Sequence, residues 1–386
     1  MSTIKVNNLE SSTGGGVVAK LASVNGGGIG TKNLVINGAM IIQQKMNAYT
    51  SGGQNLTGIK TTDRFRGDWS GTDNSPTQIP VDVAAGTTPY SLGFRKCFKI
   101  INGNQTSGAG ASDFVGIDTI LEAQDIATSG WNYTSASSFV TLSFWVKSSV
   151  AQNFYGYLFT SDGTSQNYPF ETGSLTADTW TKITKTIPGN SNLTFNNDNG
   201  AGLQIQFWAY LGTSYTGTIT LNQWGAFAGA TRTPDNTSTW YTTDDATFEI
   251  TGVQLEVGSV ATDFEHRSYA QELALCQRYY QAVVDGGTYR MISFGSIYAA
   301  TEVHGEIKHF VPMRANSTLI SPTGSNTLAL QRAGGFVSWN NGLTRNGGDV
   351  YHTYFTRDGV TMGTAGDIGR ILTWSAGGNV ALDAEL

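Results

Sequence analysis

Two stretches, Phe139-Val-Thr-Leu-Ser-Phe-Trp-Val-Lys147 and Leu203-Gln-Ile-Gln-Phe-Trp-Ala-Tyr-Leu211, decide the fold class of this chain. Apolar residues occupy every second position in both stretches: Val140, Leu142, Phe144 and Val146 in the first, and Leu203, Ile205, Phe207, Ala209 and Leu211 in the second. Successive side chains of a strand point to opposite faces of a sheet. The pattern therefore predicts two strands, each with one core face and one mixed face.

Similar short patterns recur between clusters of turn residues. They predict further strands at Leu34–Ile42, Lys96–Ile101, Phe154–Thr160, Trp180–Ile187 and Thr247–Val257. Long helical periods are absent between these segments. Many short strands without intervening helices indicate an antiparallel sandwich or jelly roll.

One segment, residues 265–281, has helical spacing of its apolar residues. Ser268 can cap its N-terminus, with Gln271 three residues later as a capping-box partner. The strand patterns after it predict a second, smaller β domain: Tyr289–Ala299, Thr301–Met313, Thr327–Gln331, Gly335–Trp339, Tyr351–Tyr354 and Ile368–Trp374.

The 386 residues suffice for two or three domains. Residues 1–30 are rich in glycine and too poor in apolar residues for a core of their own. We predict an extended N-terminal docking arm at 1–30, a jelly-roll domain at 31–263, a helical junction at 264–283 and a β tip domain at 284–386. The whole chain is thus predicted to be mostly β.

Composition excludes several partners and chemistries. Only 13% of residues are charged, the net charge is −6, and no basic run occurs, so nucleic acid is not an expected partner. No apolar stretch reaches the roughly 18 residues of a membrane span, so insertion into a membrane is not expected. Cys97 and Cys276 are predicted to be buried free thiols. No zinc-ligand spacing, phosphate-binding loop or nucleophile elbow occurs, so we expect no metal and no cofactor.

Several motifs occur together in a fixed order. They are Asn33-Leu-Val-Ile-Asn-Gly38, Thr62-Asp-Arg-Phe-Arg66, Thr141-Leu-Ser-Phe-Trp-Val-Lys147, Ile250-Thr-Gly-Val-Gln-Leu-Glu-Val-Gly258, Phe264-Glu-His-Arg267, Glu272-Leu-Ala-Leu-Cys-Gln-Arg-Tyr-Tyr280 and Val311-Pro-Met-Arg314. In this combination the chain resembles the tail-fibre and receptor-binding proteins of tailed bacteriophages, particularly phages of cyanobacteria and other marine bacteria.

The resemblance implies a carbohydrate-binding type of jelly roll in the middle of the chain. It also implies a homotrimeric fibre of the virion, most naturally of its tail. The N-terminal arm would attach to an adaptor, nozzle or baseplate, and the C-terminal domain would be distal. The expected external partner is a polysaccharide of the host surface.

The mixed faces of the two deciding strands supply the glycan-binding candidates. Trp208 and Tyr210, flanked by Gln204 and Gln206, form a row of aromatic and amide side chains, and Trp145 is expected beside it. Aromatic rings stack on the apolar faces of sugars, and amides match their hydroxyl groups. The alternative is that this face packs against a neighbouring subunit or a covering loop.

Candidates for the trimer interface come from Thr301–Met313. Val303, Ile307, His309 and Val311 share one face of this predicted strand and supply an apolar seam. Three copies of His309 on a trimer axis would be able to hold a metal or an anion. The alternative is a single hydrogen-bonded histidine.

Catalysis would need paired carboxylates, for which the candidates are Asp118 with Glu122 or Asp125, and Asp244 or Asp245 with Glu249. Nothing in their spacing marks them as catalytic. We therefore expect non-catalytic host attachment. The alternatives are a purely structural capsid or adaptor fibre, or a glycan-cleaving spike.

Overall fold

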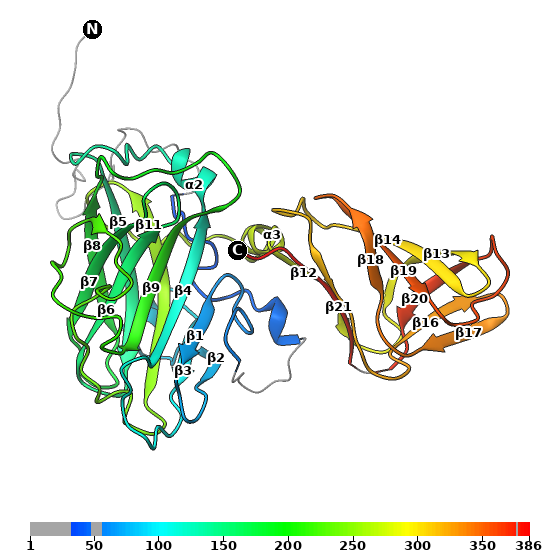
Figure 1. Ribbon diagram of the computed structural model, residues 1–386, viewed down its shortest axis with the longest axis horizontal. Coiled ribbons are helices and arrows are strands. Elements are labelled where there is room, and N and C mark those ends of the chain that lie inside the picture. Colours follow the sequence, from blue (N-terminus) through cyan, green and yellow to red (C-terminus); the bar gives the residue numbers. More distant parts are fainter. Residues whose placement is uncertain (1–31, 48–55, 376) are drawn as a thin grey trace, which may run out of the picture.

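The computed structural model describes residues 32–47, 56–375 and 377–386. The predicted N-terminal arm lies outside these residues. Figure 1 shows two β-rich parts arranged along the longest axis of the molecule, with a short helix between them.

The first part is a sandwich of two antiparallel sheets. The six-stranded sheet has the order β1-β4-β9-β6-β7-β10, and the five-stranded sheet has the order β2-β3-β11-β5-β8. The strands are β1 (Arg66–Ser70), β2 (Thr77–Asp82), β3 (Lys96–Ile101), β4 (Phe114–Glu122), β5 (Phe139–Ser148), β6 (Asn153–Thr160), β7 (Gln166–Ser174), β8 (Thr181–Pro188), β9 (Ala201–Leu211), β10 (Gly225–Ala226) and β11 (Thr247–Val257). Short helical turns lie at η1 (Gln44–Asn47), α1 (Thr88–Ser91) and α2 (Ala123–Ala127).

The core of the sandwich lies between the faces that the alternating residues define. Phe144 of β5 and Phe207 of β9 meet there with ring centroids 4.7 Å apart, although their strands belong to different sheets. Val140, Leu142, Leu203 and Ile205 are buried in the same core. The predicted antiparallel, jelly-roll-like sandwich is confirmed.

The strand predicted at Leu34–Ile42 does not form. Asn37 and Met40 have φ values of 60° and 59°, which a strand does not allow. The Asn37 side chain bonds to backbone groups that would otherwise be available for strand pairing. Its amide donates to the carbonyls of Ile42 and Asp63, and its oxygen accepts from the Ile42 N–H. An asparagine that bonds to nearby backbone in this way favours a turn.

The predicted helix is α3 (Tyr269–Gln277), and its capping box is present. The Ser268 hydroxyl accepts from the backbone N–H of Gln271, and the Gln271 side chain accepts from the backbone N–H of Ser268. These bonds satisfy donors that have no partner within the helix.

Two further antiparallel sheets follow α3. One has the order β12-β21-β15, and the seven-stranded sheet has the order β17-β16-β20-β13-β14-β19-β18. The strands are β12 (Tyr280–Gly286), β13 (Met291–Ala299), β14 (Glu302–Lys308), β15 (Thr318–Ile320), β16 (Leu328–Arg332), β17 (Gly335–Trp339), β18 (Thr344–Gly348), β19 (His352–Asp358), β20 (Ile368–Thr373) and β21 (Gly378–Asp383). A second hydrophobic cluster, separate from that of the sandwich, lies within this part. The prediction of a smaller β domain joined to the sandwich by one short helix is confirmed.

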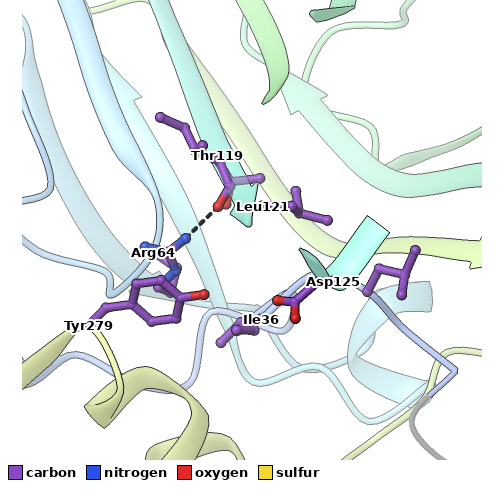
Figure 2. Close-up of a pocket in the computed structure, with 8 residues that line it drawn as sticks. Ile36, Arg64, Thr119, Leu121, Asp125 and Tyr279 are labelled. Carbon is purple, nitrogen blue, oxygen red and sulfur yellow. Dashed lines mark hydrogen bonds between the residues drawn. The ribbon is translucent and has the colours of Figure 1, made fainter. Parts of the chain in front are cut away.

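Buried charges hold the two parts together. The Arg64 guanidinium pairs with Glu385, donates to the carbonyl of Ile120 and lies 3.5 Å from the centre of the Tyr279 ring. Figure 2 shows Arg64 and Tyr279 side by side in this narrow junction. The structure thus places a buried cation at the point where the chain returns from its second part.

Two half-buried arginines add contacts across the same junction. Arg278, just after α3, makes two bonds of 2.8 Å to the carboxylate of Glu122 on β4. Arg314 donates to the carbonyl of Asn199 at 2.8 Å. Polar contacts on several sides therefore fix the orientation of the second part.

Candidate functional site

The predicted glycan platform on β9 is covered by the chain itself. Trp208 is only 4% exposed and packs edge-to-face against Phe114 at 5.6 Å and parallel to Tyr157 at 6.3 Å. Tyr215 and Phe227, from the segments that flank β10, pack against the same cluster. The prediction that Trp208 lies on an open face is wrong, and the alternative of a covering loop holds for it.

Tyr210 does not lie beside Trp208 at all. The pairing of β9 with β4 shifts between Val115 and Gly116, so an extra residue is inserted between Trp208 and Tyr210. Such a bulge reverses the alternation of side chains after it. Tyr210 therefore points into the sandwich core, where its ring stacks on Tyr241 at 4.4 Å.

The remaining three candidates are divided between the two sheets. Gln204 and Gln206 share the outer face of the six-stranded sheet with Trp208, and the Gln206 amide donates to Gln204 at 3.0 Å. Trp145 is on β5 of the other sheet and packs against the cluster around Phe94. The expectation that Trp145 adjoins the β9 row is thus corrected, because the core of the sandwich separates them.

The residues predicted to form the trimer interface make contacts within their own chain. Val303 and Ile307 are buried in the second hydrophobic cluster and present no surface to another subunit. His309 is also buried: it bonds to the Val350 carbonyl at 2.7 Å and to Thr353 at 2.9 Å, and burial lowers its pKa. Val311 is half-buried, and its carbonyl accepts from Gln281. This corrects the assignment of Val303, Ile307 and His309 to a subunit interface, because their side chains are buried within the chain; the assignment of Val311 stays a prediction.

Three of the carboxylates weighed for catalysis, Asp118, Glu122 and Glu249, are engaged in ion pairs. Asp118 makes two bonds to Arg66, of 2.8 and 2.7 Å, and Glu122 is held by Arg278. Glu249 lies 3.0 Å from the Lys147 ammonium. Among the residues that the structure describes, no group of three or more metal-ligating side chains occurs.

The outer face of the seven-stranded sheet has a different character. Phe294 on β13 is 63% exposed, Tyr354 on β19 is 47% exposed and Phe336 on β17 is 44% exposed. Other exposed aromatic residues of this part are Tyr289, Tyr298, Phe310 and Tyr351. So many uncovered rings on one domain mark an interaction surface rather than the scattered apolar residues that any protein shows.

Strand pairing places six side chains of this face in one line. Phe336 pairs with Gln331, Gln331 with Arg370, and Arg370 with Phe294. The pairing of Gly295 with Gly305 places Glu306 next to Phe294, and Glu306 pairs with Tyr354. We call this line the tip row: Phe336, Gln331, Arg370, Phe294, Glu306 and Tyr354.

An open cleft of about 460 Å³ lies on one half of the tip row. Its lining residues are Phe294, His304, Gly305, Glu306, Asn346, Tyr354 and Phe355. This volume is within the range of small-molecule sites. The lining combines aromatic rings with a carboxylate, an amide and an imidazole, so it offers stacking surfaces together with hydrogen-bond donors and acceptors.

Neighbouring side chains hold the rim of this cleft in place. The Glu302 carboxylate accepts a 2.7 Å hydrogen bond from His304, whose ring stacks on Tyr298 at 4.7 Å. His352 lies parallel to the Tyr354 ring at 6.5 Å and is 3.5 Å from the Glu306 carboxylate. His304, Tyr354 and the Glu306 carboxylate thus have neighbours within the chain that restrict their positions.

Gly305 allows close packing of the strands beneath the cleft. A methyl group at this position would lie 2.3 Å from the Phe355 ring, which is far inside van der Waals contact. Phe355 is buried directly beneath. Glycine thus lets an aromatic core residue pack against the strand that carries His304 and Glu306.

Sequence reasoning missed this surface, although part of its signal was visible. Glu302, His304, Glu306 and Lys308 alternate with apolar residues in the predicted strand and so define a polar face. Which aromatic residues lie beside them depends on strand register, and register between distant segments is not encoded in local alternation.

The chain matches no protein-family profile and no curated protein sequence. Among solved structures it is similar to the enzymatically active domain of tailspike protein 4 of bacteriophage CBA120, at 10% identity and a TM-score of 0.29 over 56% of this chain and 22% of that one. It is also similar to a putative sugar-binding protein of Bacteroides thetaiotaomicron, at 10% identity and a TM-score of 0.29, over 59% of this chain and 100% of that one.

A third similar structure is the N-terminal cellulose-binding domain of Cellulomonas fimi β-1,4-glucanase C, at 12% identity and a TM-score of 0.27 over 54% of this chain and 95% of that one. These TM-scores are too low to assign a function. The strand order of the two sheets defines the fold of the sandwich. Within the described residues, no helix has the length and apolar character needed to cross a membrane.

Proposed function

We propose that this chain is a non-catalytic attachment protein of a phage tail, which recognises a glycan of the host surface through the cleft on its tip row. The observation that carries this proposal is the set of exposed rings, Phe294 and Tyr354, that flank Glu306 above the cleft. Aromatic rings in water are costly unless a partner covers them.

The composition of the cleft favours a sugar over a protein partner. Protein interfaces have an apolar centre from which charged residues are depleted. Here Glu306 lies between the two rings in the tip row, and His304 and Asn346 also line the cleft. Sugars combine apolar C–H faces with hydroxyl groups, so they match rings and hydrogen-bonding groups that alternate.

The remainder of the chain fits the proposal as a support. The sandwich and its buried contacts to the second part hold the tip row at one end of the molecule (Figure 1). We propose that residues 1–30 attach the chain to the tail and that the chain is a homotrimer in the virion. Light scattering at micromolar concentration tests the second statement, and a stable monomer would contradict it.

The tip cleft is tested with Phe294→Ala and Tyr354→Ala. Both rings are exposed, so the variants should fold and melt as the wild type does. We expect each variant to bind surface polysaccharide fivefold to tenfold more weakly, since a stacked ring contributes about 1 kcal/mol. Adsorption to cells should fall further if several copies act together.

The matched control is Tyr269→Ala, which removes a ring that is 60% exposed on α3, outside the tip sheet. Binding is measured on an array of bacterial surface polysaccharides and by adsorption to cells. Wild-type protein that retains no glycan, or Phe294→Ala protein that adsorbs as well as the Tyr269→Ala control, would contradict the proposal and favour a purely structural fibre. Release of reducing sugar from a bound polysaccharide would instead identify a glycan-cleaving spike.

A further inference from the structure

The tip row extends well beyond the cleft. The cleft contains Phe294, Glu306 and Tyr354, which occupy three neighbouring strands, β13, β14 and β19. The other three members of the row lie on β20, β16 and β17, at the far side of Phe294. The row thus runs across six strands of the sheet, at right angles to them.

The length of the row follows from strand spacing. Neighbouring strands lie about 4.8 Å apart, so five steps from Phe336 to Tyr354 span about 24 Å. Exposed rings lie at both ends of the row and at Phe294, with hydrogen-bonding side chains between them. No single small sugar can cover this distance.

Ring contacts also support the far end of the row. Phe336 packs against Trp374 at 4.7 Å and against Tyr289 at 6.2 Å, and Trp374 meets Tyr289 edge-to-face at 5.5 Å. Despite these contacts, Phe336 keeps 44% of its surface exposed. Its ring therefore offers a fixed stacking surface to something outside the described chain.

Each of the two charged members of the row, Arg370 and Glu306, has a polar neighbour within the chain. Arg370 donates to the side-chain oxygen of Gln331, and the Glu306 carboxylate lies 3.5 Å from His352. The two charges also have opposite signs on the two sides of Phe294. The row consequently offers hydrogen bonds without a net charge that would select an anionic or a cationic ligand.

From these observations we infer that the tip row binds an extended internal segment of a linear, uncharged polysaccharide, laid across the strands from Tyr354 to Phe336. This inference rests on the proposed function and adds the length, direction and charge of the ligand. An open row with exposed rings at both ends accepts a chain that continues past it, whereas a terminal sugar needs an enclosed pocket.

The experiment uses linear oligosaccharides of about two to eight sugars, prepared from the neutral polysaccharide that wild-type protein retains best on the array. Calorimetry with these soluble probes measures single-site affinity without avidity. We expect the affinity of wild-type protein to rise at least tenfold from the shortest to the longest probe. Phe336→Ala should lower the affinity for the longest probe fivefold to tenfold and leave the affinity for the shortest probe unchanged.

Phe294→Ala and the control Tyr269→Ala complete the design. Phe294→Ala should lower the affinity for short and long probes alike, and Tyr269→Ala should lower the affinity for neither. Equal affinity for short and long probes, or an unchanged long-probe affinity of Phe336→Ala, overturns the extended site while the cleft stands. Tighter retention of acidic than of neutral polysaccharides overturns the assignment of an uncharged ligand. Failure of every glycan to bind the wild type overturns the proposed function itself.

Discussion

Replacing Trp208 by alanine should destabilise the sandwich and leave glycan binding intact. The indole is almost fully buried between Phe114 and Tyr157. On the neighbouring strand it rests over Gly116, where a methyl group would lie only 2.4 Å from the ring. Gly116 has no side chain that could relax into the space left by the ring. We therefore expect the variant to lose about 4 kcal/mol, in the range of about 3–5 kcal/mol for large-to-small changes of buried aromatic residues.

The assay is unfolding by denaturant, followed by circular dichroism, with polysaccharide binding measured on the same samples in buffer. Trp180→Ala is the matched control, because this indole is only half-buried and its removal should cost clearly less. A loss below about 1 kcal/mol for Trp208→Ala would refute the covered position of the ring. Unchanged stability together with lost adsorption would return the glycan site to β9.

Three other predictions concern buried groups. Burial raises the pKa of Asp63 from 3.8 to about 7, so the folded chain keeps a proton that the unfolded chain releases. As the pH rises from about 4 to about 7, the free energy of unfolding should therefore fall, by up to about 4 kcal/mol from this group. In a series of denaturation experiments over this pH range, the variant Asp63→Asn should show a smaller fall. A steeper decline in the variant would contradict this. Arg64→Leu removes one of the two ion-pair partners of Glu385 at the junction and leaves that carboxylate with the Lys45 ammonium, 3.5 Å away. The change should cost about 1–3 kcal/mol, part of which the double variant with Glu385→Leu should restore; equal stability of the single variant and the wild type would show that the pair is unimportant. Cys97 and Cys276 are buried free thiols whose pKa values are raised by burial, so a disulfide reagent should label neither until denaturant is added, and prompt labelling of the native chain would contradict their burial.

Local signals in the sequence are strong enough to predict much of the fold. The capping box at Ser268 and Gln271 involves residues three apart, so its hydrogen bonds follow from the sequence alone. The strand predicted at Thr247–Val257 coincides with β11, and that at Lys96–Ile101 coincides with β3. Alternation with period two determines which side chains face the core wherever the strand is regular.

The candidate site could not be predicted in the same way, because it depends on contacts between distant segments. One extra residue before Tyr210 makes its ring point into the core, and no local sequence pattern predicts this bulge. The tip row combines β17, β16, β20, β13, β14 and β19, an order that does not follow the chain. The sequence pattern shows that Val303 and Ile307 lie on an apolar face of their strand. It does not show whether this face packs within its own domain or against another subunit. In the structure the two residues are part of the second hydrophobic cluster of the same chain.

The connection between the two parts also has a mechanical consequence. β12 carries the chain into the second part and β21 brings it back, and the two strands are antiparallel neighbours, with Tyr280 opposite Asp383 and Gly286 opposite Gly378. A pull or a torque on the seven-stranded sheet therefore reaches the sandwich through two backbones tied by a hydrogen-bond ladder, and through the Arg64–Glu385 pair at its base. A single linker would let the seven-stranded sheet rotate against the sandwich more easily. This double connection should resist bending and twisting of the second part against the sandwich more than a single linker would.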